Sequence, residues 1–402
     1  MKYVVFLGDG MSDEPPVPGL GDGSRTPLQV AHTPHIDRIA REGCCGTFRS
    51  LPDGYPTSSD VANMSVLGFD LACHTGRGPL EAASQGIELR PDQIAMRCNL
   101  ITERDGILDE YSGGHLSNEE AAELIDALNA ELGSEQVRFH PGVQYRNLLI
   151  LTGEEFSPDI AYEKPDDHQG DPIEENLVKA KTPEAETTAA LLRDLTLRSK
   201  AILEAHPVNQ RRRADGQKMA NMIWPWSAGR RPGFPNFREK YGKSGAIVSA
   251  VDVIFGIGFA AGMEMVRVEG ATGWIDTNFE GKADAAVRAL ESHDFVYLHV
   301  EAMDELSHLG DASLKVKTLE EWDRRLVGRV MQALEGQEVA YAVLPDHPVP
   351  IRLRKHTRTP VPFALWKPGA TPDGVQSYDE PSCERGSMGV LEGDQLMWAL
   401  FA

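Results

Sequence analysis

Cysteine is scarce in this sequence: there are five cysteines among 402 residues, and no two have CxxC spacing. So small and odd a number does not indicate a disulfide framework. We therefore expect reduced thiols and a cytoplasmic protein.

Long apolar runs are also missing. No stretch of about 18 apolar residues occurs, so we expect no membrane-spanning helix. The opening "MKYVVFLGDG" has an apolar run too short for a signal peptide, and acidic residues follow where a cleavage site would belong. A Walker-type GxxxxGK[ST] loop is absent too, which argues against a conventional nucleotide site.

Positive charge is in short supply. The chain has 40 Lys and Arg against 61 Asp and Glu, for a formal net charge of −21 at pH 7. This balance argues against nucleic-acid binding and gives no attraction toward anionic lipid. An anionic substrate would need cations concentrated at one site.

What the chain does contain is an alternation of strands and helices. Runs rich in β-branched and aromatic residues within 3–11, 245–250, 294–300 and 339–347 predict buried strands. Segments 32–43, 251–263 and 313–336 predict helices. Such alternation is typical of an α/β domain with a largely parallel sheet flanked by helices.

The middle of the chain follows another pattern. Between 88 and 180 the apolar runs are shorter, and an acidic, proline-containing stretch occupies 154–176. We predict an inserted, smaller domain at 88–180 and a main domain made of 1–87 and 181–402. An amphipathic helix at 182–206 is expected to return the chain to the main domain.

Metal-type ligands follow three of the predicted strands. Ligands collect beyond the carboxyl ends of strands in open α/β sheets, and Asp with His suits Mn²⁺, Zn²⁺ or similar ions. This many ligands is enough for two ions, which about 4 Å apart can clamp the oxygens of a phosphoryl transfer. The residues are Asp9, Asp304, His308, Asp346, His347 and His356.

Each of these ligand groups, taken alone, has an ordinary structural explanation. Asp9 is a common turn or cap residue, Asp304 with His308 matches an exposed helix pair, and Asp346 with His347 matches a loop. Their joint placement at strand ends favours the metal hypothesis.

Two adjacent serines raise a second question in "YPTSSDVANMSVLGFD", residues 55–70. Thr57 with Asp60 resembles a capping box, which would put Ser58 and Ser59 in a first helical turn where free amides favour anions. Either simple capping or a serine nucleophile fits this stretch.

Taken together, these motifs resemble the archaeal-type cofactor-independent phosphoglycerate mutases of the alkaline phosphatase superfamily. The resemblance runs nearly end to end. It rests on "GDGMSDEP", "TPLQVAHTPHIDRIAREG", "SSDVANMSVLGFD", "TGRGPLEA", "EGATGWIDTNFEGKA", "HVEAMDELSH" and "KHTRTPVPF".

The resemblance implies an alkaline-phosphatase-like core, an inserted α+β cap and two divalent ions, often Mn²⁺, with Zn²⁺ or Mg²⁺ as alternatives. Ser59, which directly precedes Asp, would be the nucleophile, and Lys282 would lie near the transferring phosphoryl group. Arg77 and Arg97 would bind the substrate's anionic groups. One ion would be held by Asp304, His308 and His356, and the other by Asp9, Ser59, Asp346 and His347.

The implied activity is isomerisation: interconversion of 2- and 3-phosphoglycerate in glycolysis through a phosphoserine, without 2,3-bisphosphoglycerate. The cap would exclude water, because an open site would hydrolyse the phosphoserine. The stretch around Ser59 lacks the C/S-x-P-x-R pattern of sulfatases.

The chain also departs from the archaeal pattern. "YPTSSD" stands for "RPGSD", and "DEYSGGH" at 109–115 stands for an arginine-rich "DRRAGR". Arg211–Arg213 or Arg230 and Arg231 could replace the lost cations, or could simply be a solvated basic loop. A phosphotransferase on another small acceptor, such as a homoserine kinase, is the alternative function.

Overall fold

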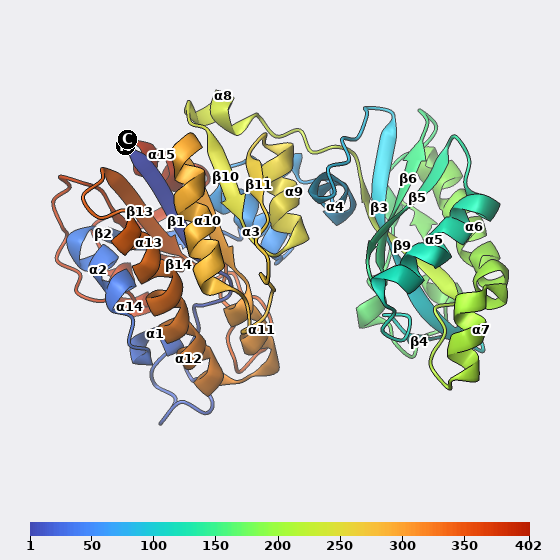
Figure 1. Cartoon of the computed structure of the whole chain (residues 1–402), viewed down its shortest axis with the longest axis horizontal. Coiled ribbons are helices and arrows are strands. Elements are labelled where there is room, and N and C mark those ends of the chain that lie inside the picture. Colours follow the sequence, from blue (N-terminus) through green and yellow to red (C-terminus); the bar gives the residue numbers. More distant parts are fainter. The chain divides into compact units, whose positions relative to one another are not determined.

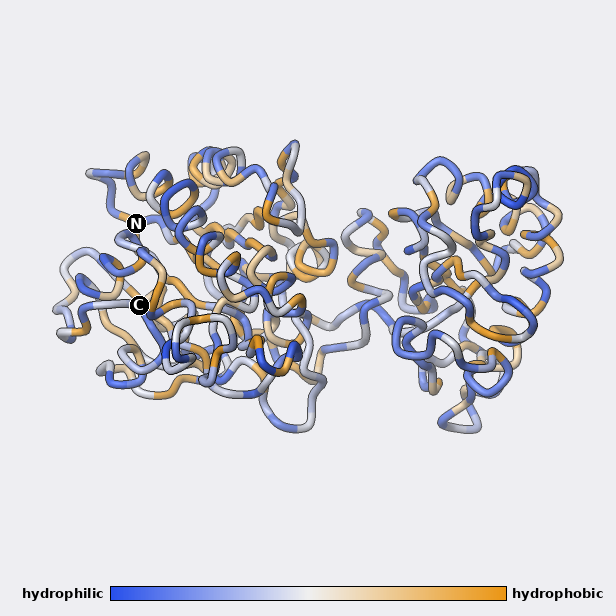
Figure 2. Tube along the Cα trace, turned by 90° about the horizontal axis from the view of Figure 1, so that it is seen from below, coloured by the Kyte–Doolittle hydropathy of each residue, from blue (hydrophilic) through white to orange (hydrophobic).

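The computed structural model describes residues 1–402, and the chain forms two compact units. Residues 1–74 and 233–402 make up the core unit, and residues 75–232 make up the inserted unit (Figure 1). In Figure 2 hydrophobic segments gather inside each unit and hydrophilic segments prevail along its outer loops. No helix combines the length and apolarity needed to cross a bilayer.

The core unit is built on one eight-stranded sheet in the order β11-β10-β12-β1-β13-β14-β2-β15. Strands β11, β10, β12, β1 and β13 run parallel to one another, whereas β14 is antiparallel to both its neighbours. The strands are β1 Lys2–Gly8, β2 Cys44–Arg49, β10 Gly245–Val248, β11 Glu264–Val266, β12 Phe295–Val300, β13 Val339–Leu344, β14 Val361–Trp366 and β15 Val390–Glu392. The predicted α/β class with a mostly parallel sheet is confirmed.

Helices cover both faces of this sheet. Val4 and Phe6 of β1 pack with α2, α10, α12 and α13 in one apolar cluster, while Tyr3 of β1 meets Phe401 of α15 on the other face. Burial on both faces is why the central strands are apolar throughout rather than alternating. The helices are α1 Pro27–Val30, α2 Pro34–Glu42, α3 Ser59–Val66, α8 Phe237–Tyr241, α9 Asp252–Ala260, α10 Phe279–Ser292, α11 Ala302–Leu309, α12 Ala312–Trp322, α13 Gly328–Ala333, α14 Glu380–Glu384 and α15 Gln395–Phe401, with a 3-10 turn at Leu71–Cys73.

The segment predicted as one helix at 313–336 is interrupted. A π-helical turn, Asp323–Val327, joins α12 to α13. Such insertions are uncommon and have local causes. Here the turn brings the Asp323 carboxylate to the first amides of α2, where it accepts hydrogen bonds from the N–H groups of His35 and Ile36.

The inserted unit has an antiparallel sheet in the order β4-β3-β6-β5, with β9 pairing on β3. Helices α5 and α6 pack their apolar faces against it in one cluster. Its elements are α4 Arg77–Ser84, β3 Gln93–Arg104, β4 Ile107–Glu110, α5 Asn118–Leu132, β5 Val137–Val143, β6 Arg146–Thr152, β7 Ile160–Ala161, β8 Lys179–Ala180, α6 Glu186–Ala205, α7 Pro207–Ala214 and β9 Met222–Gly229, with 3-10 turns at Pro165–Asp167, Glu174–Asn176 and Pro183–Ala185.

The boundaries of this unit differ from the prediction of 88–180. The unit spans 75–232, and the amphipathic helix expected to rejoin the main domain is α6, whose Leu192 and Leu195 pack in the inserted unit. The cause is β9, which closes the sheet on β3 from more than a hundred residues along the chain. Sequence periodicity gives no sign of so distant a strand pairing.

Candidate metal and phosphoryl-transfer site

The ends of three neighbouring strands bring the predicted ligands together. Asp9 follows β1, Asp346 and His347 follow β13, and the loop after β12 leads into α11 with Asp304 and His308. Gly10 makes this convergence feasible: its φ is +60°, and a Cβ there would lie 2.7 Å from the Cα of Asp304. A larger residue would therefore push the two strand ends apart.

Asp304, His308 and His356 form the first ligand group. Asp304 Oδ2 lies 3.4 Å from His308 Nε2, and Asp304 Oδ1 lies 3.5 Å from His356 Nε2. The two imidazoles approach each other to 3.0 Å. Burial alone would raise the pKa of Asp304, but the attraction of the adjacent His308 and His356 imidazoles outweighs it and holds that pKa well below its usual range. The same carboxylate raises the pKa of His308 to about 9.

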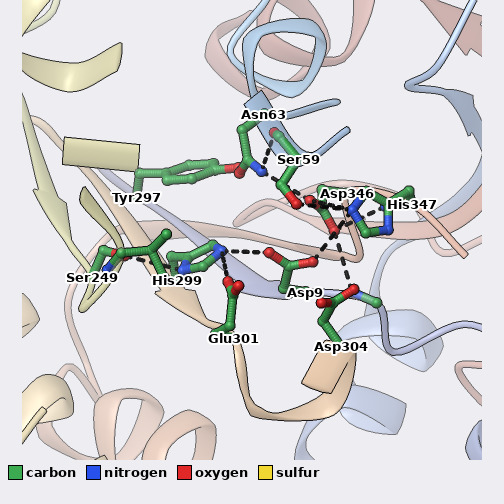
Figure 3. A network of polar contacts seen from close by, with 12 residues as sticks. Asp9, Ser59, Asn63, Ser249, Tyr297, His299, Glu301, Asp304, Asp346 and His347 are labelled. Carbon is green, nitrogen blue, oxygen red and sulfur yellow. Dashed lines mark hydrogen bonds and ion pairs between the residues drawn. The ribbon is translucent and has the colours of Figure 1, made fainter. Parts of the chain in front are cut away.

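The second group contains Asp9, Asp346, His347 and Ser59 (Figure 3). His347 Nε2 lies 3.5 Å from Asp9 Oδ1, 3.3 Å from Asp346 Oδ2 and 3.2 Å from Ser59 Oγ. Asp346 Oδ1 accepts hydrogen bonds from the backbone N–H groups of Gly10 and His347. Ligand atoms of Asp9, Asp304 and His347 all lie within 4.8 Å of one another, so the two groups adjoin.

Ser59, and not Ser58, meets these ligands. Helix α3 begins at Ser59, with Ser58 as an N-cap whose side chain makes no capping hydrogen bond. The predicted Thr57 cap is therefore wrong. Asp60 sits at the second helical position rather than the third, and its Oδ2 instead lies 2.5 Å from His74 Nε2.

Asn63 and Tyr297 hold the first turn of α3 in place, and the sequence analysis missed both. The Asn63 side-chain amide donates to the Ser59 carbonyl and to Asp346 Oδ2, at 2.8 and 2.9 Å. The buried Tyr297 hydroxyl donates to Asn63 Oδ1 at 2.5 Å. Asn63 lies four residues after Ser59, on the same helix face, and that spacing was the available signal.

His299, Glu301 and Lys282 border the second group on its other side. His299 is buried in β12, with Nε2 3.0 Å from Asp9 Oδ2 and 3.7 Å from Glu301 Oε2. Lys282, on α10, is fully buried and donates to the His299 carbonyl at 3.2 Å. Sequence reasoning predicted Lys282 but missed His299 and Glu301, whose signal was two polar residues at the end of an apolar strand.

Burial controls the protonation of these bordering groups. It lowers the pKa of Lys282 to about 8, against the opposing pull of Glu301. It also lowers the pKa of His299 well below its usual value and lowers that of His347. Glu301 shows the reverse effect, since burial and the nearby Asp304 raise its pKa to about 8.

The arrangement suits divalent cations. Asp9 Oδ1 and Asp304 Oδ1, which face the Nε2 atoms of His347 and His356, are buried and make no hydrogen bond. Burial, followed by Asp346, Glu301 and Asp304, raises the pKa of Asp9 well above its usual value. Like charges buried this closely require a cation or protons, so the donor set fits metal ions.

Glu14, in the motif "GDGMSDEP", holds the loop that carries His347 and His356. Glu14 Oε1 accepts hydrogen bonds from the hydroxyls of Thr357 and Thr359, both at 2.7 Å, and Glu14 Oε2 pairs with Arg352 at 2.9 Å. These partners flank His356 along the chain. The loop is therefore fixed by hydrogen bonds within the core unit.

Arg77 and Arg97 belong to the inserted unit, whereas all the metal-type ligands belong to the core unit. Arg97 is buried, with Nε 3.0 Å from Glu81 Oε1 and its guanidinium 4.5 Å from the ring centroid of Trp226. Burial lowers the pKa of Arg97, against the opposing effect of Glu81. Arg77 begins α4, and its backbone N–H donates to Ser227 Oγ at 2.9 Å.

Three of the other arginines considered as replacements for lost cap cations have protein partners. Arg212 is buried and lies 2.7 Å from Glu120 Oε2. Arg230 donates to the carbonyls of Pro91 and Phe156, and Arg231 pairs with Glu88 at 2.6 Å. These contacts indicate that Arg212 and Arg230 tie segments of the inserted unit together.

A mixed α/β core with carboxylates and imidazoles at its strand ends, and a serine at a helix N-terminus beside them, is typical of enzymes that transfer phosphoryl groups with divalent ions. Comparisons with known proteins narrow this class. The model of the 2,3-bisphosphoglycerate-independent phosphoglycerate mutase family matches residues 40–209. The protein of that name from Methanosarcina acetivorans is 46% identical over 404 residues, which cover 100% of this chain and 99% of its own length.

Solved structures agree with the sequence comparison. A Pyrococcus horikoshii protein matches with a TM-score of 0.83 and 27% identity, over 99% of this chain and 96% of its own. The cofactor-independent phosphoglycerate mutase from Thermoplasma acidophilum matches with a TM-score of 0.70 and 28% identity, over 100% of this chain and 99% of its own. The chain belongs to the 2,3-bisphosphoglycerate-independent phosphoglycerate mutase family.

Proposed function

We propose that this chain is an isomerase that interconverts 2- and 3-phosphoglycerate without 2,3-bisphosphoglycerate. The observation that carries the proposal is the position of Ser59. Its Oγ lies at the first turn of α3 and 3.2 Å from His347, among the clustered carboxylates. Full-length relatives named as this mutase support the same activity over a homoserine kinase.

Two divalent ions complete the proposed site. We assign one to Asp304, His308 and His356, and the other to Asp9, Ser59, Asp346 and His347. Mn²⁺ suits this mixture of carboxylate and imidazole, with Zn²⁺ and Mg²⁺ as alternatives. When bound, the ions supply the positive charge that phosphoryl oxygens and an ionised serine require.

The reaction proceeds in two transfers through Ser59. In the first, Ser59 loses its proton and its Oγ bonds to phosphorus, while the bond between phosphorus and the substrate's 3-oxygen breaks and that oxygen takes up a proton to become the 3-hydroxyl of glycerate. In the second, the glycerate 2-hydroxyl attacks the phosphoserine, and the Ser59 oxygen leaves and regains a proton. Free amides at the first turn of α3 favour the anionic phosphoryl group.

The other proposed residues act around this transfer. Lys282, whose ammonium is buried beside the ligand cluster, stabilises charge on the phosphoryl group. Arg77 and Arg97 are proposed to bind the substrate's carboxylate and phosphate, a role suited to guanidinium groups. We place the reaction in the cytoplasm, in keeping with five unpaired cysteines.

An enolase-coupled assay with Mn²⁺-loaded protein tests the proposal. Ser59→Ala should abolish turnover, and the matched control Ser58→Ala should retain it, because the Ser58 hydroxyl makes no capping bond. Acid quenching with substrate present should leave a phosphoryl group on Ser59. Absence of turnover with Mn²⁺, Zn²⁺ and Mg²⁺, together with ATP-dependent phosphorylation of homoserine measured in parallel, would overturn the mutase assignment.

A further inference from the structure

A fully buried histidine links the central strands to the ligand cluster without being one of the predicted ligands. His299 is fully buried near the end of β12, and both of its ring nitrogens have polar partners (Figure 3). Nδ1 lies 3.1 Å from Ser249 Oγ, at the end of β10, and Nε2 lies 3.0 Å from Asp9 Oδ2. The chain Ser249–His299–Asp9 thus crosses three neighbouring strand ends.

The direction of these hydrogen bonds follows from their partners. Ser249 Oγ accepts a hydrogen bond from the Val251 backbone N–H at 3.1 Å, which leaves its own proton free to be donated. That proton can go to His299 Nδ1. An ionised Asp9 Oδ2 can only accept a hydrogen bond, so the single N–H of a neutral His299 lies on Nε2 and Nδ1 accepts the Ser249 proton.

The consequence falls on Asp9. With Oδ2 engaged by His299, the carboxylate presents Oδ1, which is buried and makes no hydrogen bond, toward His347 Nε2 at 3.5 Å. A ligating carboxylate whose other oxygen is held in this way loses less rotational freedom when an ion binds.

The same place has a competing interpretation, since Asp9, His299 and Glu301 are close enough together to hold an ion themselves. Two contacts oppose it. Both His299 nitrogens are already engaged, and the Lys282 ammonium donates to the His299 carbonyl, so a cation already lies beside this group.

We propose that His299 is a positioning residue, oriented by Ser249, that fixes Asp9 for the metal ion of the second ligand group. The inference rests on the proposed function only in assigning Asp9 to that ion. What the inference adds is a series of hydrogen bonds, called the relay below, that runs from the Val251 N–H through Ser249 and His299 to Asp9.

Two substitutions of similar size distinguish the contribution of His299 Nε2 from that of Nδ1. In His299→Gln the side-chain amide nitrogen occupies the place of Nε2 and can still donate to Asp9. In His299→Asn the polar group occupies the place of Nδ1, and the donor to Asp9 is lost. His293→Gln, at an imidazole that pairs with Glu264 outside the ligand cluster, is the control.

Mn²⁺ titration of the metal-free proteins, followed calorimetrically and by metal analysis, provides the readout. His299→Asn should weaken the affinity for one of two ions roughly 10- to 100-fold, the usual effect of losing a ligand's outer hydrogen bond. His299→Gln should lose only a few-fold, and His293→Gln should match the wild type. Equal affinity in the Asn and Gln variants would overturn the relay.

Three further outcomes are informative. If His299→Asn fails to fold, Ser249→Ala decides instead: weakened binding of one ion supports the relay, and unchanged binding overturns it. A wild-type stoichiometry of three ions that falls to two in His299→Gln would make His299 a ligand. Wild-type protein that binds two ions but does not turn over phosphoglycerate would refute the proposed function and leave the relay intact.

Discussion

The ligand cluster of the core unit and the inserted unit bury charged groups in opposite ways. In the core unit, buried carboxylates crowd one another: Asp9, Asp304 and Asp346 meet at the strand ends, beside imidazoles. In the inserted unit, buried charges face opposite charges, as in Arg97 with Glu81 and Arg212 with Glu120.

This difference separates buried charges that hold the fold together from buried charges that form a ligand site. A buried pair of opposite charges largely satisfies itself, and it fixes two segments relative to each other. A buried cluster of like charges destabilises the fold until a cation joins it. The ligand cluster therefore costs the core unit stability until a cation completes it, whereas Arg97 and Arg212 of the inserted unit already have carboxylate partners.

The largest expected effect comes from Asp9→Asn, which removes one of the crowded charges. Mutase activity should fall on the order of a thousandfold, because metal-ion stabilisation of the transition state is worth several kcal/mol. The metal-free variant should nevertheless be more stable than metal-free wild type, by on the order of 1 kcal/mol, because burial and Asp346 disfavour the ionised Asp9.

Denaturant unfolding with and without Mn²⁺ measures this reversal. Mn²⁺ should stabilise the wild type strongly and Asp9→Asn weakly, so the order of stability inverts when the metal is added. A metal-free variant less stable than metal-free wild type would contradict the view that these carboxylates repel one another.

The second-largest effect is expected from breaking the Arg97–Glu81 pair of the inserted unit. Glu81→Gln leaves the buried Arg97 guanidinium without its carboxylate partner, and removing one member of a buried pair typically costs about 3–5 kcal/mol. Hydrogen exchange over residues 75–232 should accelerate, while the Mn²⁺ content stays at the wild-type value. Hydrogen exchange is the suitable probe because the two units need not unfold together.

A double variant sharpens this result. In Arg97→Met with Glu81→Gln, no charge remains unpaired, so much of the protection should return. The same proteins test the proposed substrate contact, since loss of the Arg97 guanidinium should raise KM in the double variant without changing metal content. An unchanged KM would remove Arg97 from the substrate site.

The same contrast explains how far the sequence could predict the site. Asp304 with His308, and Asp346 with His347, could be found because strand ends of a parallel sheet meet at one edge. His299 could not, because one polar residue inside a buried strand looks the same whether it is a satisfied core group or part of a site. Only its partners, Ser249 and Asp9, distinguish the two, and both come from other strands.

The fold shows the same division between local and distant information. The apolar run of β1 and the amphipathic pattern of α6 are local, and both elements form where predicted. The sheet on which α6 packs is not encoded locally. It depends on β9 pairing with β3, so the inserted unit extends well beyond the predicted 88–180.

The smallest effect concerns a buried carboxylate of the core unit that lies outside the ligand cluster. Asp323 accepts the N–H groups of His35 and Ile36, and burial raises its pKa to about 7 despite these two hydrogen bonds. The native pKa exceeds the unfolded value of about 4, so the native state holds its proton more tightly. Stability conferred by protonated Asp323 is therefore present near pH 4 and is lost as pH rises toward 7.

Asp323→Asn removes this titration but keeps an oxygen for the α2 amides. The variant's unfolding free energy relative to wild type should therefore rise by about 2 kcal/mol between about pH 5 and pH 7, where Asp323 ionises in the unfolded wild-type chain but keeps its proton in the native one. Urea unfolding of metal-free protein at several pH values measures the difference. If that difference stays constant with pH, Asp323 is ionised throughout and the two helix amides satisfy its charge. Burial without a cation would then be tolerable for a lone carboxylate, and the need for metal would be confined to the crowded strand ends.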